Sequence, residues 1–141
     1  MKSALVIVLL AALTAAQAEQ IAATSALYIA GERFSLEQAI ADATLESLGP
    51  DGASPFTVVA IGPESRKLTF KGTRPNVRDA VRRMQQSGGL FFVCERDVKQ
   101  AGWARKDLLP GVQVERGLSD KELSDGSAGE APSVRRIRRL C

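Results

Sequence analysis

The sequence predicts a three-layer α/β domain with a mainly parallel sheet of four to five strands. Three observations support this fold class. Strand-like and helix-like patterns alternate along the chain, and the segments at 56–61 and 90–94 are almost continuously apolar, as expected for strands covered on both faces. The chain of 141 residues has the length of one ordinary domain. We therefore expect right-handed crossovers between neighbouring parallel strands.

The predicted strands share an apolar run that ends at a turn signal. Gly31, Gly62-Pro63 and Gly72 are examples of these signals. The last strand is the shortest, and the segment at 67–70 is predicted as a short extended piece. The strands are predicted at 24–30, 56–61, 90–94 and 112–114.

The predicted helices have clear start and stop signals. Ser35 is expected to cap a helix that begins at Leu36, with Gln38 at the capping-box position. Pro75 opens a second helix, because proline is favoured in the first helical turn. Asp107 is expected to cap a brief turn. The helices are predicted at 36–48, 75–86 and 97–101, the last ending at Gly102.

The first 18 residues have the pattern of an export signal. Lys2 precedes an apolar run at 4–13, and Ala16-Gln17-Ala18 fits a cleavage site before Glu19. The alternative is an uncleaved anchor, but the run is about half of the ~20 apolar residues that span a membrane. We predict a signal peptide at 1–18, an α/β domain at 19–117, and a soluble, exported, periplasmic protein.

The composition excludes several kinds of site. The chain contains no histidine, which removes Ser-His-Asp and Cys-His catalysis and the usual imidazole metal ligands. Two cysteines cannot close a zinc site, so no metal or cofactor is expected. The formal net charge of +3 gives no general case for nucleic-acid binding.

Cys94 is the one candidate chemical centre. It ends the strand at 90–94, directly before a helix, at the edge where parallel sheets bind ligands. Unpaired amides at that helix start would stabilise a thiolate, Arg96 and Lys99 would add to the positive field, and Glu95 would oppose it. The alternative is a structural cysteine that completes a buried apolar run. The sequence leaves both interpretations open.

Cys141 is the second thiol, and its role has two interpretations. In an oxidising compartment two cysteines pair by default, which would join Cys94 and Cys141 in a structural disulfide. Alternatively Cys141 is a reactive thiol that exchanges with Cys94 or with another chain.

The segment at 118–141 is predicted as a polar, flexible tail that ends in clustered positive charge. In the simpler interpretation this charge is solvated. In the other, Val134, Ile137 and Leu140 form the apolar stripe of a helix that docks on an acidic partner or an anionic membrane surface. The basic cluster consists of Arg135, Arg136, Arg138 and Arg139.

Two further residues were considered for the thiol site. Trp103 would line the thiol pocket, or alternatively pack internally or at an oligomer contact. Asp97 is interpreted as a helix cap rather than an acid–base group.

The segment at 89–112, GLFFVCERDVKQAGWARKDLLPGV, resembles the strand–cysteine–helix–DLLPGV signature of DsrE/DsrF-like proteins, in particular their exported branch. The segment FTVVAIGP at 56–63 also looks like this family's second strand and turn. The matching positions are Val93-Cys94, Val98-Lys99, Gly102 and residues 107–112.

The resemblance implies a three-layer α/β fold that assembles into homo-oligomers. It also implies that Cys94 accepts sulfane sulfur from a donor protein and passes it on as a persulfide, without a cofactor. Arg96-Asp97 stands where the family has Asn-Thr, and the C-terminal segment differs. These departures favour an alternative: a non-catalytic oligomeric or partner-binding module of the same fold. A third possibility is an envelope component that joins a larger assembly through the arginine-rich tail.

Overall fold

The computed structural model describes residues 26–47, 56–125 and 132–141. The predicted signal peptide at 1–18 and its cleavage site before Glu19 lie outside the described residues. None of the helices in the described ranges is long and apolar enough to cross a membrane.

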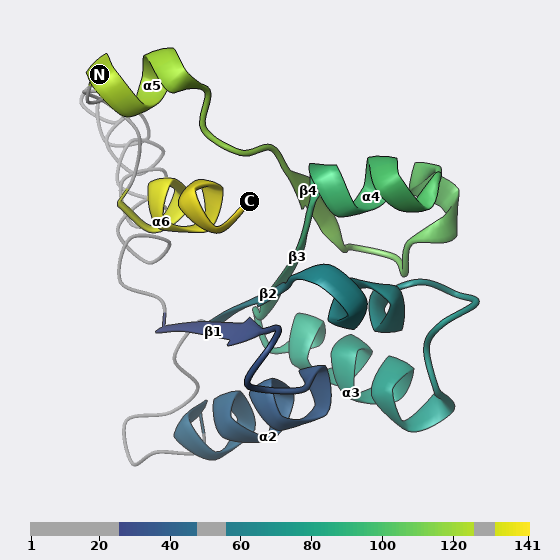
Figure 1. The fold of residues 1–141 in the computed structure, drawn as a ribbon. Helices are drawn as coiled ribbons and strands as arrows, with labels where there is room; N and C mark the ends of the chain where they lie inside the picture. Colours follow the sequence, from purple (N-terminus) through teal and green to yellow (C-terminus); the bar gives the residue numbers. More distant parts are fainter. Residues whose placement is uncertain (1–25, 48–55, 126–131) are drawn as a thin grey trace, which may run out of the picture.

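The centre of the fold is a four-stranded sheet in which every neighbouring pair is parallel. Helices flank the sheet, so the predicted three-layer α/β architecture is confirmed (Figure 1). The strand order is sequential, β1-β2-β3-β4. The strands are β1 (Ala26–Ala30), β2 (Phe56–Ala60), β3 (Leu90–Cys94) and β4 (Gln113–Glu115).

Helices α2 (Leu36–Ser47) and α3 (Pro75–Gln86) pack against one face of the sheet and enclose the main core. As predicted, Ser35 caps α2, because its Oγ accepts a hydrogen bond at 3.1 Å from the Gln38 amide. The largest side chains that are completely removed from solvent on this face include Leu36, Leu68, Val58, Val81 and Phe91.

The connection after β2 differs from the prediction. The first two residues of the expected extended piece at 67–70 lie within a 3-10 helix, η1 (Gly62–Leu68). Gly62 adopts a φ of 60°, and proline follows it in the first turn, so the chain turns tightly instead of extending. Thr69 is extended, as predicted, and forms an isolated antiparallel bridge with Leu108.

The segment after β3 begins with helix α4 (Glu95–Ala101), which ends at Gly102 with a φ of 69°. A short 3-10 turn, η2 (Arg105–Asp107), follows. Asp107 closes this turn rather than starting the next one, because its carboxylate accepts a hydrogen bond at 2.7 Å from the Ala104 amide.

The second face of the sheet has its own apolar cluster. Val59 and Phe92 point to this face and pack with Ile137 of helix α6 (Pro132–Leu140). Figure 1 shows α6 across the sheet from α2 and α3, with the short helix α5 (Asp120–Asp125) beyond it. Parallel sheets bury both faces, and α6 provides this cover.

The C-terminal segment therefore differs from the flexible tail expected over 118–141. Its described parts form α5 and α6, and Ile137 is 4% exposed. The stripe of Val134, Ile137 and Leu140 is the reason, because its spacing puts one apolar line along a helix. Its middle residue, Ile137, packs against Val59 and Phe92 of this chain's own sheet.

We predict that Ile137→Ala loosens α6. Removing a buried isoleucine side chain costs about 2 kcal/mol or more, which corresponds to roughly 30-fold faster opening. The readout is hydrogen exchange of the Cys141 amide, which is bonded to the Ile137 carbonyl. Leu123→Ala in α5 is the control, since Leu123 is 53% exposed. Equal exchange rates in both variants would show that Ile137 does not anchor the helix.

Candidate redox site

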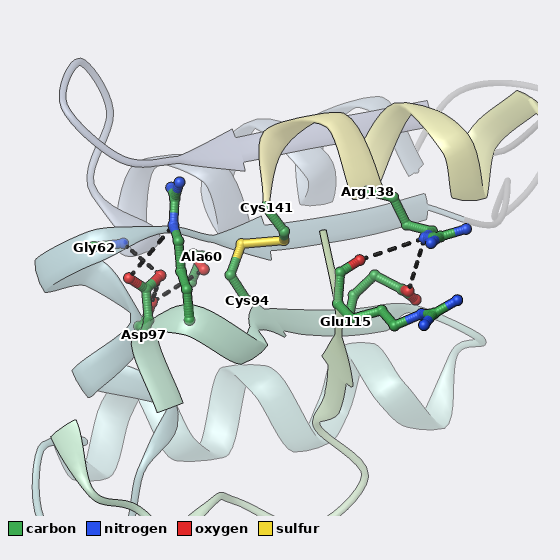
Figure 2. The surroundings of a disulfide bond; sticks show 10 residues. Ala60, Gly62, Cys94, Asp97, Glu115, Arg138 and Cys141 are labelled. Carbon is green, nitrogen blue, oxygen red and sulfur yellow. Dashed lines mark hydrogen bonds and ion pairs between the residues drawn. A yellow bond between two sulfur atoms is a disulfide. The ribbon is translucent and has the colours of Figure 1, made fainter. Parts of the chain in front are cut away.

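A disulfide joins Cys94 to Cys141 across the second face of the sheet. The two Cα atoms are 5.1 Å apart, and 47 positions separate the residues in sequence. Cys94 has no exposed surface, whereas Cys141 is partly exposed. In Figure 2 the bond connects the end of β3 to the residue after α6. The sequence left Cys141 either in a disulfide with Cys94 or as a reactive thiol, and the structure contains the internal disulfide.

The strand and the helix place the two sulfur atoms together. Cys94 is two positions after Phe92, so both side chains point to the face that α6 covers. Cys141 continues the helical hydrogen bonding of α6, its amide donating to the Ile137 carbonyl at 3.2 Å. The chemistry available in this state is thiol–disulfide exchange, because a cystine sulfur has no proton to lose.

Arg96 and Lys99, the cations expected to support a thiolate, are exposed and have carboxylate partners. Arg96 Nε lies 3.9 Å from Asp97 Oδ1, and Lys99 Nζ lies 3.4 Å from Glu95 Oε1. Their positive charge is thus partly balanced at the surface of α4.

Asp97 links α4 to η1. Its carboxylate Oδ2 accepts hydrogen bonds from the Gly62 amide at 2.9 Å and from Ser65 Oγ at 3.2 Å. Ser65 Oγ also donates to the Ala60 carbonyl at 3.1 Å (Figure 2 shows the Asp97 end of this arrangement). Asp97 therefore acts as a polar tie between segments rather than as the cap of its own helix.

Trp103 packs against the main core cluster, on the opposite side of the sheet from the α6 cluster. It lines two hollows, one with Phe70 and Lys106 and one with Pro63 and Gln100. Neither hollow has a cysteine among its described lining residues. The structure thus places Trp103 apart from the disulfide.

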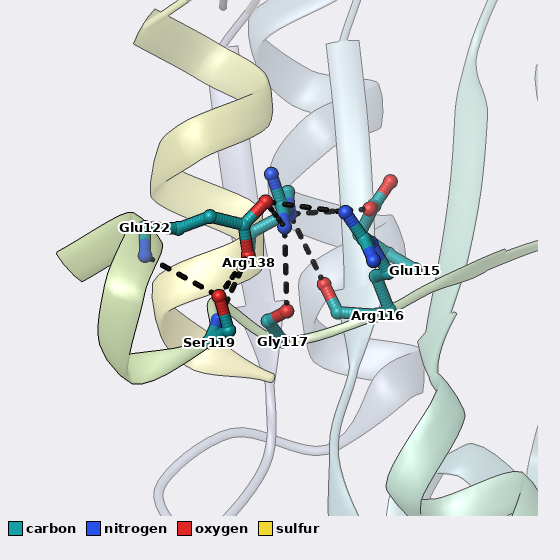
Figure 3. A network of polar contacts seen from close by, with 6 residues as sticks. All are labelled: Glu115, Arg116, Gly117, Ser119, Glu122 and Arg138. Carbon is teal, nitrogen blue, oxygen red and sulfur yellow. Dashed lines mark hydrogen bonds and ion pairs between the residues drawn. The ribbon is translucent and has the colours of Figure 1, made fainter. Parts of the chain in front are cut away.

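A second attachment of α6 is a buried arginine (Figure 3). The Arg138 residue is 6% exposed, and its Nη2 contacts Glu122 Oε1 of α5 at 2.7 Å. Its Nε lies 3.9 Å from Glu115 Oε1 of β4. The hydrogen bond from Arg138 and those from Ser119 lower the pKa of Glu122 to about 2. This network was missed from sequence, where only the basic cluster gave a signal.

The four arginines of the predicted basic cluster thus have different environments. Arg136 and Arg139 are exposed, whereas Arg138 is buried against acidic side chains of the same chain. Arg135 is partly buried, and its Nε has no hydrogen-bond partner among the described residues. The acidic surface on which this helix docks therefore lies within the protein itself.

Among the described residues, no group of three or more histidine, cysteine or acidic side chains is arranged to hold a metal ion. Comparisons of the chain with protein-family models, with curated proteins and with solved structures find no match.

Replacing Asp97 by alanine is predicted to destabilise the protein by about 1–3 kcal/mol, because the Gly62 amide loses its acceptor and the Ser65 hydroxyl keeps only the Ala60 carbonyl. Urea unfolding measures this change. Asp79→Ala is the control, since that exposed carboxylate forms only a surface ion pair with Arg82. A loss for Asp97→Ala no larger than that of the control would contradict a structural tie.

The attachment of α5 to α6 is predicted to weaken in acid. The folded pKa of Glu122 is depressed, so its contribution is fully present above its ordinary pKa of 4.5 and is lost as the pH falls towards 2. In the Glu122→Gln variant, the attachment of α5 to α6 should no longer change over this pH range, because the titrating carboxyl is absent. Carboxyl NMR titration of Glu122 checks the pKa directly, and Arg138→Gln should move the midpoint up towards 4.5. A wild-type midpoint near 4.5 would refute the network's electrostatic role.

Proposed function

We propose that this chain is an exported, periplasmic thiol-redox protein of the DsrE-like type, with Cys94 and Cys141 as a reversible pair. When the pair is reduced, Cys94 carries sulfane sulfur as a persulfide. One observation supports this above the others: the disulfide joins the end of the central strand β3 to the residue that follows the short helix α6. Such a helix can leave the sheet without disturbing the main core.

The exposure of the two sulfur-bearing residues suggests how the bond opens. Cys141 is partly exposed and Cys94 is buried, so a reductant's thiolate attacks the Cys141 sulfur. A mixed disulfide forms on Cys141, and the electron pair of the broken bond leaves with Cys94 as a thiolate. A second thiol of the reductant then releases Cys141.

Reduced Cys94 takes up sulfur by a balanced exchange. Its thiolate attacks the terminal sulfur of a donor persulfide, R–S–SH, giving Cys94–S–SH and R–S⁻. The Cys141 thiolate can then attack the inner sulfur of that persulfide. This step re-forms the Cys94–Cys141 disulfide and releases HS⁻, so the sulfane sulfur of the donor persulfide is the two-electron oxidant of the pair. The dithiol reductant then reduces the disulfide before another sulfur atom is taken up.

The resemblance of residues 89–112 to DsrE/DsrF-like proteins supports the persulfide role of Cys94. The apolar N-terminal run and the disulfide both support an oxidising compartment, where such bonds persist. Partners of this function are a sulfur donor or acceptor protein and a dithiol reductant.

The two cysteine variants are predicted to differ after pre-reduction and incubation with a small-molecule persulfide. Cys94→Ser should carry no persulfide at position 94, because the nucleophilic sulfur is absent. Cys141→Ser should retain Cys94–S–SH, because the thiol that releases sulfide is absent. The wild type should return to the disulfide with about one HS⁻ released per chain. Intact-mass analysis and a sulfide assay measure these products.

Two results would refute this function. One is equal persulfide loading of Cys141→Ser and Cys94→Ser, with both variants folded by circular dichroism. The other is a disulfide that periplasmic dithiol reductants leave intact in the folded protein.

A second candidate function is a non-catalytic oligomeric or partner-binding module. The complete burial of Cys94 favours it, because a buried cystine that holds α6 is a structural staple. The reduction potential of the Cys94–Cys141 disulfide discriminates the two functions. Structural disulfides have reduction potentials below about −300 mV, and exchangeable disulfides have higher ones. This alternative implies that copies of the chain bind one another, and sedimentation measures whether such homo-oligomers form. Binding of the exposed Arg136 and Arg139 to anionic vesicles tests the membrane-surface partner.

A further inference from the structure

A cavity of about 400 Å³ opens beside the disulfide, where β1 and β2 end at their carboxyl edge. Its apolar walls come from three separate elements of the fold. Ile29 belongs to β1, Ile61 follows β2, and Leu140 is the last helical residue of α6. The carboxyl edge of a parallel sheet is the usual place for a ligand site, and the volume lies in the range of such sites.

The charged residues of the cavity lining are two arginines and one glutamate. Arg33 and Arg96 line the cavity and are exposed, with Glu32 as the one carboxylate among the lining residues. Within the described parts of the chain, Arg33 forms no ion pair. Arg96 is paired with Asp97 only through its Nε, which lies 3.9 Å from Asp97 Oδ1. The terminal amino groups of both guanidinium groups are thus available to donate hydrogen bonds to a bound anion.

Apolar walls beneath two guanidinium groups match a ligand that has a hydrocarbon body and one anionic head. Phe34, which is 49% exposed at the same cavity, would lose solvent contact when such a body is bound. A purely polar anion would leave this apolar surface in water, and a neutral hydrocarbon would leave the two cations without a partner.

We propose that the cavity binds a short aliphatic carboxylate. The carboxylate lies between Arg33 and Arg96, and the alkyl chain lies against Ile29, Ile61 and Leu140. The proposal does not require that Cys94 ever carries sulfur. It depends on the disulfide, however, because Leu140 immediately precedes Cys141 and the bond holds that wall in place.

Octanoate is the probe, titrated into the oxidised, signal-free chain and followed by calorimetry and by amide NMR shifts. Saturable binding is expected, with shifts at Gly31, Ile61 and Leu140, and with at least about tenfold weaker binding of 1-octanol and octylammonium. Absence of saturable octanoate binding at millimolar concentration would overturn the proposal. Equal affinities for octanoate and 1-octanol would do the same.

Variants locate the site. Arg33→Gln and Arg96→Gln are each expected to weaken octanoate binding at least about fivefold, while Arg78→Gln, an equal charge change at an exposed position of α3, leaves it unchanged. Gly31→Leu should block the cavity. A Cβ at Gly31 meets only Ile61 Cβ at 3.8 Å, an ordinary contact, so this variant is expected to fold. Unchanged affinity in Gly31→Leu would overturn the location.

The role of the disulfide is tested with the same probe. Cys141→Ser is expected to weaken octanoate binding at least about fivefold, because α6 then leaves the cavity for part of the time. Unchanged affinity in this variant would overturn the assignment of Leu140 as a wall. Persulfide loading of Cys94 is a separate measurement, so failure here and failure of the thiol-redox function are distinguishable.

Discussion

The sequential order of four parallel strands is the constraint on which the rest of the structure depends. Crossovers between adjacent parallel strands have the same hand, so their helices accumulate on one face of the sheet. Helices α2 and α3 share one core cluster in keeping with this rule. All five residues of β2 are nevertheless buried, which requires cover on both faces. In the described structure α6 supplies the cover over Val59 and Phe92.

A helix of nine residues cannot hold this position by itself, since isolated helices below about 12–15 residues are marginal in water. Three attachments hold it: Ile137, the Arg138–Glu122 pair and the disulfide. The ion pair gains only modest net stability, because the desolvation of Arg138 opposes the attraction and Glu122 remains partly exposed to water. For a loop of 47 residues, the chain-entropy treatment assigns the disulfide about 4 kcal/mol. The covalent bond is therefore the dominant attachment.

The parts that the sequence predicted correctly are those that depend on local chemistry. Ser35, Pro75 and Gly102 mark helix ends through nearby backbone groups, and the apolar runs of β2 and β3 require burial wherever they lie. The parts that sequence reasoning missed depend on distant partners. The composition of 118–141 is polar, and nothing local shows that Glu115 and Glu122 neutralise Arg138. For Cys94, the sequence pattern predicted its place at the end of β3, but it did not decide between a disulfide-bonded cysteine and a reactive thiol.

That choice connects the two candidate functions physically. The sulfur of Cys94 cannot hold α6 and act as a nucleophile at the same time, because each role requires a different oxidation state. In the oxidised state α6 completes both the second core and the wall of the carboxyl-edge cavity. In the reduced state Ile137 and Arg138 are the remaining attachments described here, and both are weaker than the bond. Reduction therefore releases the thiol and loosens its cover in one step. The free-energy difference between the disulfide and the dithiol therefore separates the two proposed functions, the structural scaffold and the thiol-redox protein.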